Sequence, residues 1–121
     1  MDRRSYEKYC EEELIKKGCI VQKEFLRATY INGGKLAARP SDFFSGTTDV
    51  IAICDDGVHL IQVTSGSRNN VTERQRKFDS IFTKEYPGVN LEVWHYVKGR
   101  KYILNRRIEG KWQQLGVLRK I

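Results

Sequence analysis

The stretch Gly46-Thr-Thr-Asp-Val-Ile-Ala-Ile53, followed by Val58-His-Leu-Ile-Gln-Val-Thr64, decides the fold of this chain. Both runs are mainly apolar and predict two buried strands, and the Asp-Asp-Gly segment between them predicts a tight turn. Asp49 opens the first strand. Gln62 and Thr64 are two residues apart on the second strand, so their side chains share a face. The hairpin therefore brings a carboxylate beside a pair of polar side chains.

The segments before this hairpin predict a helix, a strand and a long loop. Residues 4–17 carry apolar residues at helical spacing, and Gly18 follows where a helix commonly ends. Residues 19–26 predict a first strand. Residues 32–47 are rich in Gly, Pro and Ser and predict a long loop, which inside a compact domain is more often functional than idle.

The segments after the hairpin predict a second helix and further strands. Thr72 and Gln75 form a capping box that predicts a helix start, and Pro87-Gly88 ends that helix. Residues 91–97 and 101–108 predict strands, and a last hairpin leads into residues 111–115. This order predicts a single α+β or mixed α/β domain over residues 1–121, with a central mixed sheet of about five strands flanked by helices.

The charge of the chain favours a polyanionic partner. The formal net charge is +7, from 22 Lys and Arg against 15 Asp and Glu. Nucleic acid is the first expectation and an anionic membrane surface the second, while a solvated basic surface is the simplest alternative. No helix-turn-helix, zinc-finger or RNA-recognition signature is present, which argues against a sequence-specific regulator. The basic clusters expected to read DNA phosphates are Arg68, Arg74, Arg76, Lys77, Lys98, Arg100, Lys101, Arg106 and Arg107.

The cysteines and the lack of long apolar runs predict a cytoplasmic protein. Cys10, Cys19 and Cys54 are odd in number and form no C-x-x-C pair, so they predict reduced, mostly buried thiols and neither a disulfide framework nor a zinc site. No secretory signal or apolar membrane span is visible, so no membrane association is expected. His59 and His95 are interpreted as structural histidines.

The order of elements and the polar residues of the hairpin resemble the restriction-endonuclease-like superfamily, whose motif is PD-(D/E)XK. The resemblance is greatest to archaeal Holliday-junction resolvases and covers roughly residues 4–108. Tyr6-Glu7-Lys8 precedes Gly18 at the spacing of the family's first-helix Glu, which gives Glu7 that role. Asp49 matches the Asp that opens the second strand, and Gln62-Val63-Thr64 matches the Glu-x-Lys of the third.

The resemblance implies a metal-dependent DNA endonuclease that hydrolyses phosphodiesters. Mg²⁺, with Mn²⁺ as a substitute, would be bound by Asp49, Gln62 and the carbonyl of Val63, because Mg²⁺ prefers oxygen ligands and activates bound water. Glu7 would assist the metal or a water. Branched DNA such as a Holliday junction is the implied substrate, a symmetric homodimer the implied assembly, and no small-molecule cofactor is implied.

Two positions depart from the family motif and leave an alternative open. Gln62 is neutral, and Thr64, which occupies the position of the catalytic Lys, supplies no ammonium group. Some relatives recruit a basic residue from the following helix, so Lys77 or Arg74 could serve here, as could Arg68; a solvated surface charge is the competing interpretation of each. The alternative function is a degenerate relative that binds DNA or a DNA-processing partner without cutting. A defence or mobile-element nuclease with another substrate also stays open.

Overall fold

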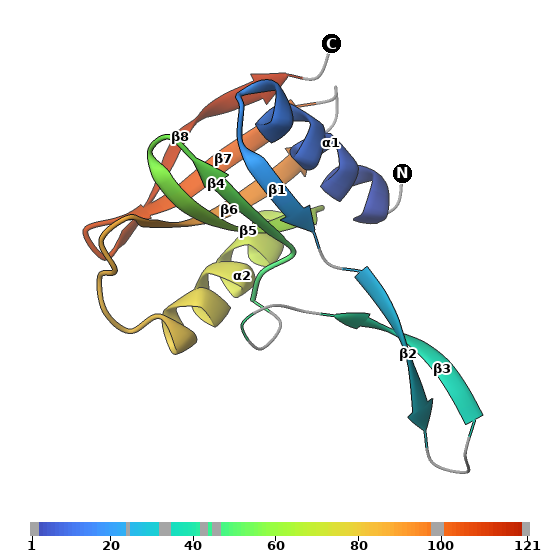
Figure 1. The fold of residues 1–121 in the computed structure, drawn as a ribbon. Coiled ribbons are helices and arrows are strands. Elements are labelled where there is room, and N and C mark those ends of the chain that lie inside the picture. Colours follow the sequence, from blue (N-terminus) through green and yellow to red (C-terminus); the bar gives the residue numbers. More distant parts are fainter. Residues whose placement is uncertain are drawn as a thin grey trace.

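A six-stranded mixed sheet with one helix on each face forms the body of the protein (Figure 1). The computed structural model describes residues 3–23, 25–31, 35–41, 44, 47–97 and 101–119. The mixed α/β class predicted from the sequence is confirmed, with one strand more than expected in the sheet. The elements are α1 (Arg3–Lys16), β1 (Ile20–Lys23), β2 (Phe25–Ile31), β3 (Lys35–Ser41), β4 (Val50–Cys54), β5 (Gly57–Ser65), α2 (Arg68–Ile81), β6 (Val89–Val97), β7 (Lys101–Ile108) and β8 (Lys111–Arg119).

The strand order of the sheet is β1-β4-β5-β6-β7-β8. β4 and β5 form the predicted hairpin, with Val50 paired to Ile61. β5 and β6 are parallel, and α2 is the crossover between them, as a parallel pair requires. All other neighbours in the sheet are antiparallel. The β4–β5 hairpin therefore lies in the interior of the sheet.

Two hydrophobic clusters hold the helices on opposite faces. Cys10 and Leu14 of α1 pack with one set of sheet residues, which includes Ile61 and Val63 of β5. Val71 and Phe78 of α2 pack with the other set, which includes Leu60 of β5. β5 therefore contributes apolar side chains to both faces, which explains why it is an almost continuous apolar run in the sequence.

A two-stranded arm replaces much of the loop predicted for residues 32–47. β2 and β3 pair antiparallel from Phe25 with Ser41 to Ile31 with Lys35, in a sheet of their own. The arm projects away from the main sheet (Figure 1). Pro40 did not prevent pairing, because each strand of an isolated hairpin is an edge strand and tolerates a residue without an N–H. The strand predicted for residues 19–26 is correspondingly split, since β1 ends at Lys23.

The start of α2 also differs from the prediction. The helix begins at Arg68, and Ser67 occupies the N-cap position with an extended backbone, φ −78° and ψ 163°. The capping box predicted at Thr72 is therefore wrong, because Thr72 lies within the helix and its hydroxyl donates to the carbonyl of Arg68 at 3.2 Å. Asn70 secures the start of the helix, since its Nδ2 donates to the Ser65 carbonyl at 2.7 Å.

Two of the three cysteines are joined in a disulfide. Antiparallel pairing of β1 with β4 sets Ile20 opposite Ile53, and the next positions are Cys19 and Cys54, whose Cα atoms lie 4.5 Å apart. The expectation of reduced thiols is therefore wrong for this pair, because strand pairing brings together cysteines that are 35 residues apart in the chain. Cys10 is a buried free thiol, as expected. Because two of the cysteines form a disulfide, cysteine usage gives no support to a cytoplasmic location.

None of the helices in the described part of the chain is long and apolar enough to cross a membrane.

Candidate metal centre

The structure brings the side chains of Asp49 and Gln62 into contact. The Nε2 atom of Gln62 donates to Asp49 Oδ2 at 2.6 Å, and the backbone N–H of Val63 donates to the same oxygen at 3.0 Å. The backbone N–H of Asp49 in turn donates to the carbonyl of Ile61 at 2.8 Å. Asp49 is thus fixed at the open end of the β4–β5 hairpin, just before β4 begins.

Both side chains are buried, and one polar atom between them is unsatisfied. Asp49 is 1% exposed and Gln62 is 3% exposed. A carboxylate is tolerated at such depth only when donors satisfy it, and the two hydrogen bonds to Oδ2 do so. Among the residues that the structure describes, Gln62 Oε1 is buried with no hydrogen-bond partner, which is rare for a native polar atom.

The backbone of Val63 adds a third oxygen to this place. Its N–H points toward Asp49, and the N–H and C=O of one strand residue lie on the same edge of the strand. The Asp49 carboxylate, the unsatisfied Gln62 Oε1 and the Val63 carbonyl therefore form a set of potential metal ligands that are all oxygen atoms. This set fits a hard cation such as Mg²⁺, which selects carboxylate and carbonyl oxygens over nitrogen or sulfur.

Thr64 supplies no charge to the site. Its side chain is buried, with 7% exposed, and its Oγ1 lies 3.4 Å from the Ser65 carbonyl, a long and weak hydrogen bond. By strand alternation it shares the α2 face with Gln62. The position that carries an ammonium group in the resembled family is therefore neutral here.

Glu7 lies on the sheet-facing side of α1. It is 3% exposed and in line with Cys10 and Leu14, one and two turns further along the helix. Burial raises the pKa of the Cys10 thiol well above its ordinary value, and the charges of Glu92, Asp49 and Glu7 raise it further. Glu7 and Asp49 are thus both within electrostatic reach of one buried sulfur.

Arg74 is the basic residue of α2 that turns toward the sheet. It lies three residues after Val71 and four before Phe78, which both face the sheet, and its Nε is buried without a partner in the described part of the chain. Asp79, on the opposite flank of α2, binds Arg107 of β7 at 3.0 Å. The flank with Arg74 is therefore turned toward the β4 side of the sheet, at 100° per residue along the helix.

Lys77, one candidate to replace the missing ammonium group, is exposed. The sequence left Lys77 or Arg74 open as the recruited basic residue, with Lys77 placed among the catalytic residues and Arg74 among the DNA contacts, and burial favours Arg74. Helical spacing of Arg74 from Val71 and Phe78 was the signal that could have identified it. Arg68 is exposed at the start of α2 and Lys101 partly exposed at the start of β7, while Lys98 and Arg100 lie outside the described residues.

Arg106 and Arg107, expected to bind phosphates, are held in internal ion pairs. Arg107 also donates to the carbonyls of Phe82 and Lys84, which ties β7 to the end of α2. Arg106 binds the carboxylate of Glu92 through Nε at 3.0 Å and Nη2 at 2.8 Å. These two side chains therefore stabilise the fold.

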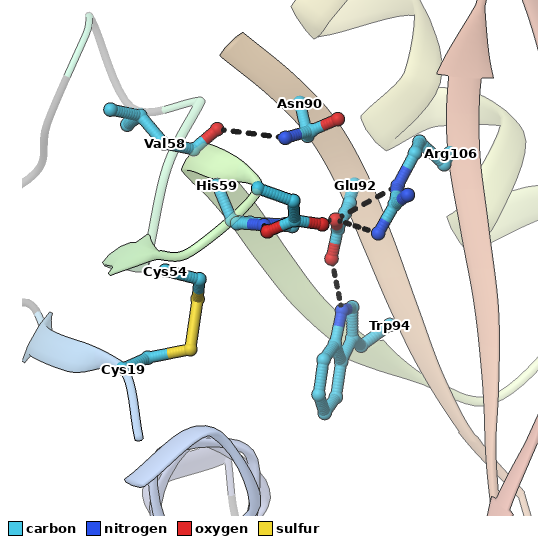
Figure 2. Close-up of a disulfide and its surroundings, with 9 residues drawn as sticks. Cys19, Cys54, Val58, His59, Asn90, Glu92, Trp94 and Arg106 are labelled. Carbon is cyan, nitrogen blue, oxygen red and sulfur yellow. Dashed lines mark hydrogen bonds and ion pairs between the residues drawn. A yellow bond between two sulfur atoms is a disulfide. The ribbon is translucent and has the colours of Figure 1, made fainter. Parts of the chain in front are cut away.

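Glu92 is the centre of a second polar cluster, which lies beside the disulfide (Figure 2). Its Oε2 is bonded to His59 Nδ1, its Oε1 accepts from Trp94 Nε1 at 2.9 Å, and His59 Nε2 lies 2.7 Å from Asp56 Oδ1. His59 is on the face of β5 opposite Gln62, as the sequence predicts. His95 is also buried, with Nε2 2.7 Å from the Gly66 carbonyl.

Comparison with known proteins gives no matching family model, no matching curated protein and no matching solved structure. The family assignment is therefore a proposal that rests on the residues described above.

Proposed function

We propose that this protein is a DNA-binding endonuclease with a restriction-endonuclease-like core, which uses Mg²⁺ or Mn²⁺ to hydrolyse phosphodiesters. The proposal is carried by one observation, the buried contact between Asp49 and Gln62 with Gln62 Oε1 left unsatisfied. A cation there would pair with the carboxylate and use the orphaned amide oxygen. When bound, Mg²⁺ supplies polarisation of the phosphate and a lowered pKa of a coordinated water.

The order of the elements supports the core. α1 precedes three antiparallel strands of the main sheet, β1, β4 and β5, and α2 then leads to β6, which is parallel to β5. The same order of helix, three strands, helix and strand underlies the resemblance found in the sequence. The β2–β3 arm is an insertion between β1 and β4 that leaves this pairing intact.

Positive charge supports DNA as the partner. The net charge is +7, and the strands of the arm contain Arg27, Lys35 and Arg39 with no acidic residue. Arg27 and Arg39 occupy directly paired positions. A hairpin with basic and no acidic residues suits the phosphates of a DNA backbone.

Each residue of the site would have a separate role. Asp49, Gln62 and the Val63 carbonyl would hold the cation. Arg74 would offset negative charge on the phosphate, the task that the family's Lys performs, because it is the cationic side chain of α2 directed at the sheet. Glu7 lies on the α1 face of the sheet, from which its charge would act on the site.

Binding without cutting is the second candidate function, and the same contact provides its support. Gln62 Nε2 and Val63 N–H already satisfy Asp49 Oδ2, so the hairpin is stable without a cation. Thr64 offers no ammonium group. The double substitution Gln62→Glu with Thr64→Lys separates the candidates: a parent that is inert and a double variant that cuts identify a binding protein on a nuclease scaffold.

Incubation with labelled single-stranded, duplex and four-way-junction DNA tests the proposal. With Mn²⁺ we expect cleavage, greatest on the junction, and with a chelator none. Asp49→Asn should abolish cutting, whereas Asp55→Asn, the same change at an exposed position in the β4–β5 turn, should not. Cleavage by Asp49→Asn at the parent rate would exclude this hairpin as the active site.

A symmetric homodimer is part of the proposal, because two equivalent subunits suit a substrate with two equivalent scissile strands. Light scattering at micromolar concentration would measure the mass of the assembly. A single chain in the absence of DNA, together with a single chain per junction in its presence, would refute the homodimer.

A further inference from the structure

A second group of potential metal ligands surrounds the turn between β4 and β5. Ligand atoms of Cys54, Asp56 and His59 all lie within 4.8 Å of one another. Cys19 belongs to the same place because its sulfur is bonded to that of Cys54. His59 lies on the opposite face of β5 from Gln62, so this group is distinct from the candidate metal centre at Asp49.

A cavity gives an ion access to these side chains. Its volume is about 220 Å³, and its lining includes Cys19, Cys54, Asp56, His59 and Glu92. The side chain of Asp56 is 62% exposed while that of His59 is 5% exposed. The group therefore reaches from the solvent to the interior of the α1 face.

His59 is held as metal-binding histidines commonly are. One ring nitrogen, Nδ1, is hydrogen-bonded to the carboxylate of Glu92, and the other, Nε2, is hydrogen-bonded to the carboxylate of Asp56. A carboxylate on the far nitrogen fixes the ring and raises its basicity toward a metal. Glu92 is itself fixed by Trp94 and Arg106, as Figure 2 shows. The imidazole is thus oriented before any metal arrives.

We propose that the reduced protein binds a zinc-type divalent cation through Cys19, Cys54, His59 and Asp56, and that the Cys19–Cys54 disulfide abolishes this binding. Two thiolates, one imidazole and one carboxylate are a suitable four-ligand set for Zn²⁺. The soft sulfur ligands distinguish this site from the all-oxygen set at Asp49. The inference does not depend on the proposed nuclease function.

A dithiol reductant converts the oxidised protein to the reduced protein. The reductant delivers two electrons and two protons, the Cys19–Cys54 bond breaks, two thiols form, and the reductant closes its own disulfide. Binding of Zn²⁺ then releases the two thiol protons to solvent, because the thiolate is the ligand. Metal and disulfide compete for the same two sulfurs, so bound Zn²⁺ protects them from oxidation.

Titration of the full chain with Co²⁺ as a spectroscopic probe tests this site. After reduction with a phosphine that is then removed, we expect a near-ultraviolet thiolate-to-cobalt charge-transfer band that saturates at one ion per chain and disappears on adding Zn²⁺. The oxidised wild-type protein should show no such band. A reduced protein without the band, or an oxidised protein that shows it with equal intensity, would overturn the proposal.

Matched variants assign the ligands. Cys54→Ser should abolish the band, whereas Cys10→Ala, at the free cysteine in the core, should retain it. Glu92→Gln should weaken Co²⁺ affinity about 10- to 100-fold without removing the band, as loss of an outer partner does. Asp49→Asn should leave the charge-transfer band unchanged, because Asp49 contributes no ligand to this site. Retention of the band by a folded Cys54→Ser protein, as judged by circular dichroism, would exclude this cluster as the site.

Discussion

Gln62 donates a 2.6 Å hydrogen bond from Nε2 to Asp49 Oδ2, across the interior hairpin of the sheet. A glutamate at this position would repel Asp49 in the absence of a cation, whereas the amide stabilises it. The glutamine therefore makes the hairpin independent of metal for its stability, and it leaves one amide oxygen available to a metal.

Gln62→Glu should make the stability of the protein depend on a cation. The variant loses the hydrogen bond and places a second carboxylate at a buried site, which should lower the free energy of unfolding by about 1–3 kcal/mol in chelator. Mn²⁺ should restore most of that loss. Thermal melting with and without Mn²⁺ measures the effect, with Gln113→Glu on exposed β8 as control. An equal response to Mn²⁺ in both variants would contradict the assignment.

Arg74 and Lys77 should differ in their effects although they carry the same charge. Arg74→Gln should lower the rate of cleavage about 10²-fold, as removal of a preorganised charge does, because its guanidinium faces the sheet. Lys77→Gln should change the rate little, since the side chain is exposed. Single-turnover cleavage at saturating DNA concentration measures both. Greater loss in Lys77→Gln would favour Lys77 over Arg74 as the recruited basic residue.

DNA affinity should fall steeply with salt and depend little on sequence. Lysine and arginine contacts release condensed counterions, and each lost contact should reduce the slope of log K against log salt by about 0.9. Arg68→Ala and Lys101→Ala should each produce such a reduction on every duplex. Fluorescence anisotropy from low to high salt measures the slopes. Affinity that is insensitive to salt would exclude a backbone-reading interface.

Stability should be greatest in mildly acidic solution because of the His59–Glu92 pair. Burial alone raises the pKa of Glu92, but the hydrogen bond and charge of His59 lower it below the ordinary 4.5, so its contribution is lost as the pH falls through the lowered value. Burial lowers the pKa of His59, but Glu92 and Asp56 raise it above 6.5, so its contribution is lost as the pH rises through the raised value.

The pair is therefore fully stabilising between pH 4.5 and 6.5. Arg106, the other charged group on Glu92, stays protonated throughout. Chemical denaturation from below pH 4.5 to above pH 6.5 should show a loss of stability at each end in the parent protein and a flatter profile in Glu92→Gln. A Glu92→Gln profile parallel to that of the parent would show that other groups set the pH dependence.

The sequence was sufficient for the central hairpin, because β5 is buried on both faces and β4 on the α1 face, which leaves an apolar run in each strand. The contact between Asp49 and Gln62 was also predictable, because the turn sets the register of β4 against β5 and this register brings the two residues together. The arm was not predictable, because a two-stranded hairpin lacks the apolar alternation that burial imposes on strands in a larger sheet.

The disulfide and the polar cluster at Glu92 depend on long-range pairing that local patterns do not encode. Cys19 meets Cys54 only once β1 joins β4, and His59 meets Glu92 only once β5 joins β6. Spacing along the chain carries no sign of either contact. The position of Arg74 was predictable in part. Its helical spacing from Val71 and Phe78 indicated that it lies toward the buried face of α2, but not which part of the sheet that face covers.

Binding of Mn²⁺ to the oxidised protein tests the central claim most directly, since oxidation removes the cysteine ligands of the second site. Electron paramagnetic resonance of free Mn²⁺ counts the bound ions without requiring catalysis. We expect one bound ion per chain for the parent protein, competition by Mg²⁺, and loss of that ion in Asp49→Asn but not in Asp55→Asn. Equal binding by the Asp49→Asn and parent proteins, or no binding by the parent, would contradict a metal centre at this hairpin.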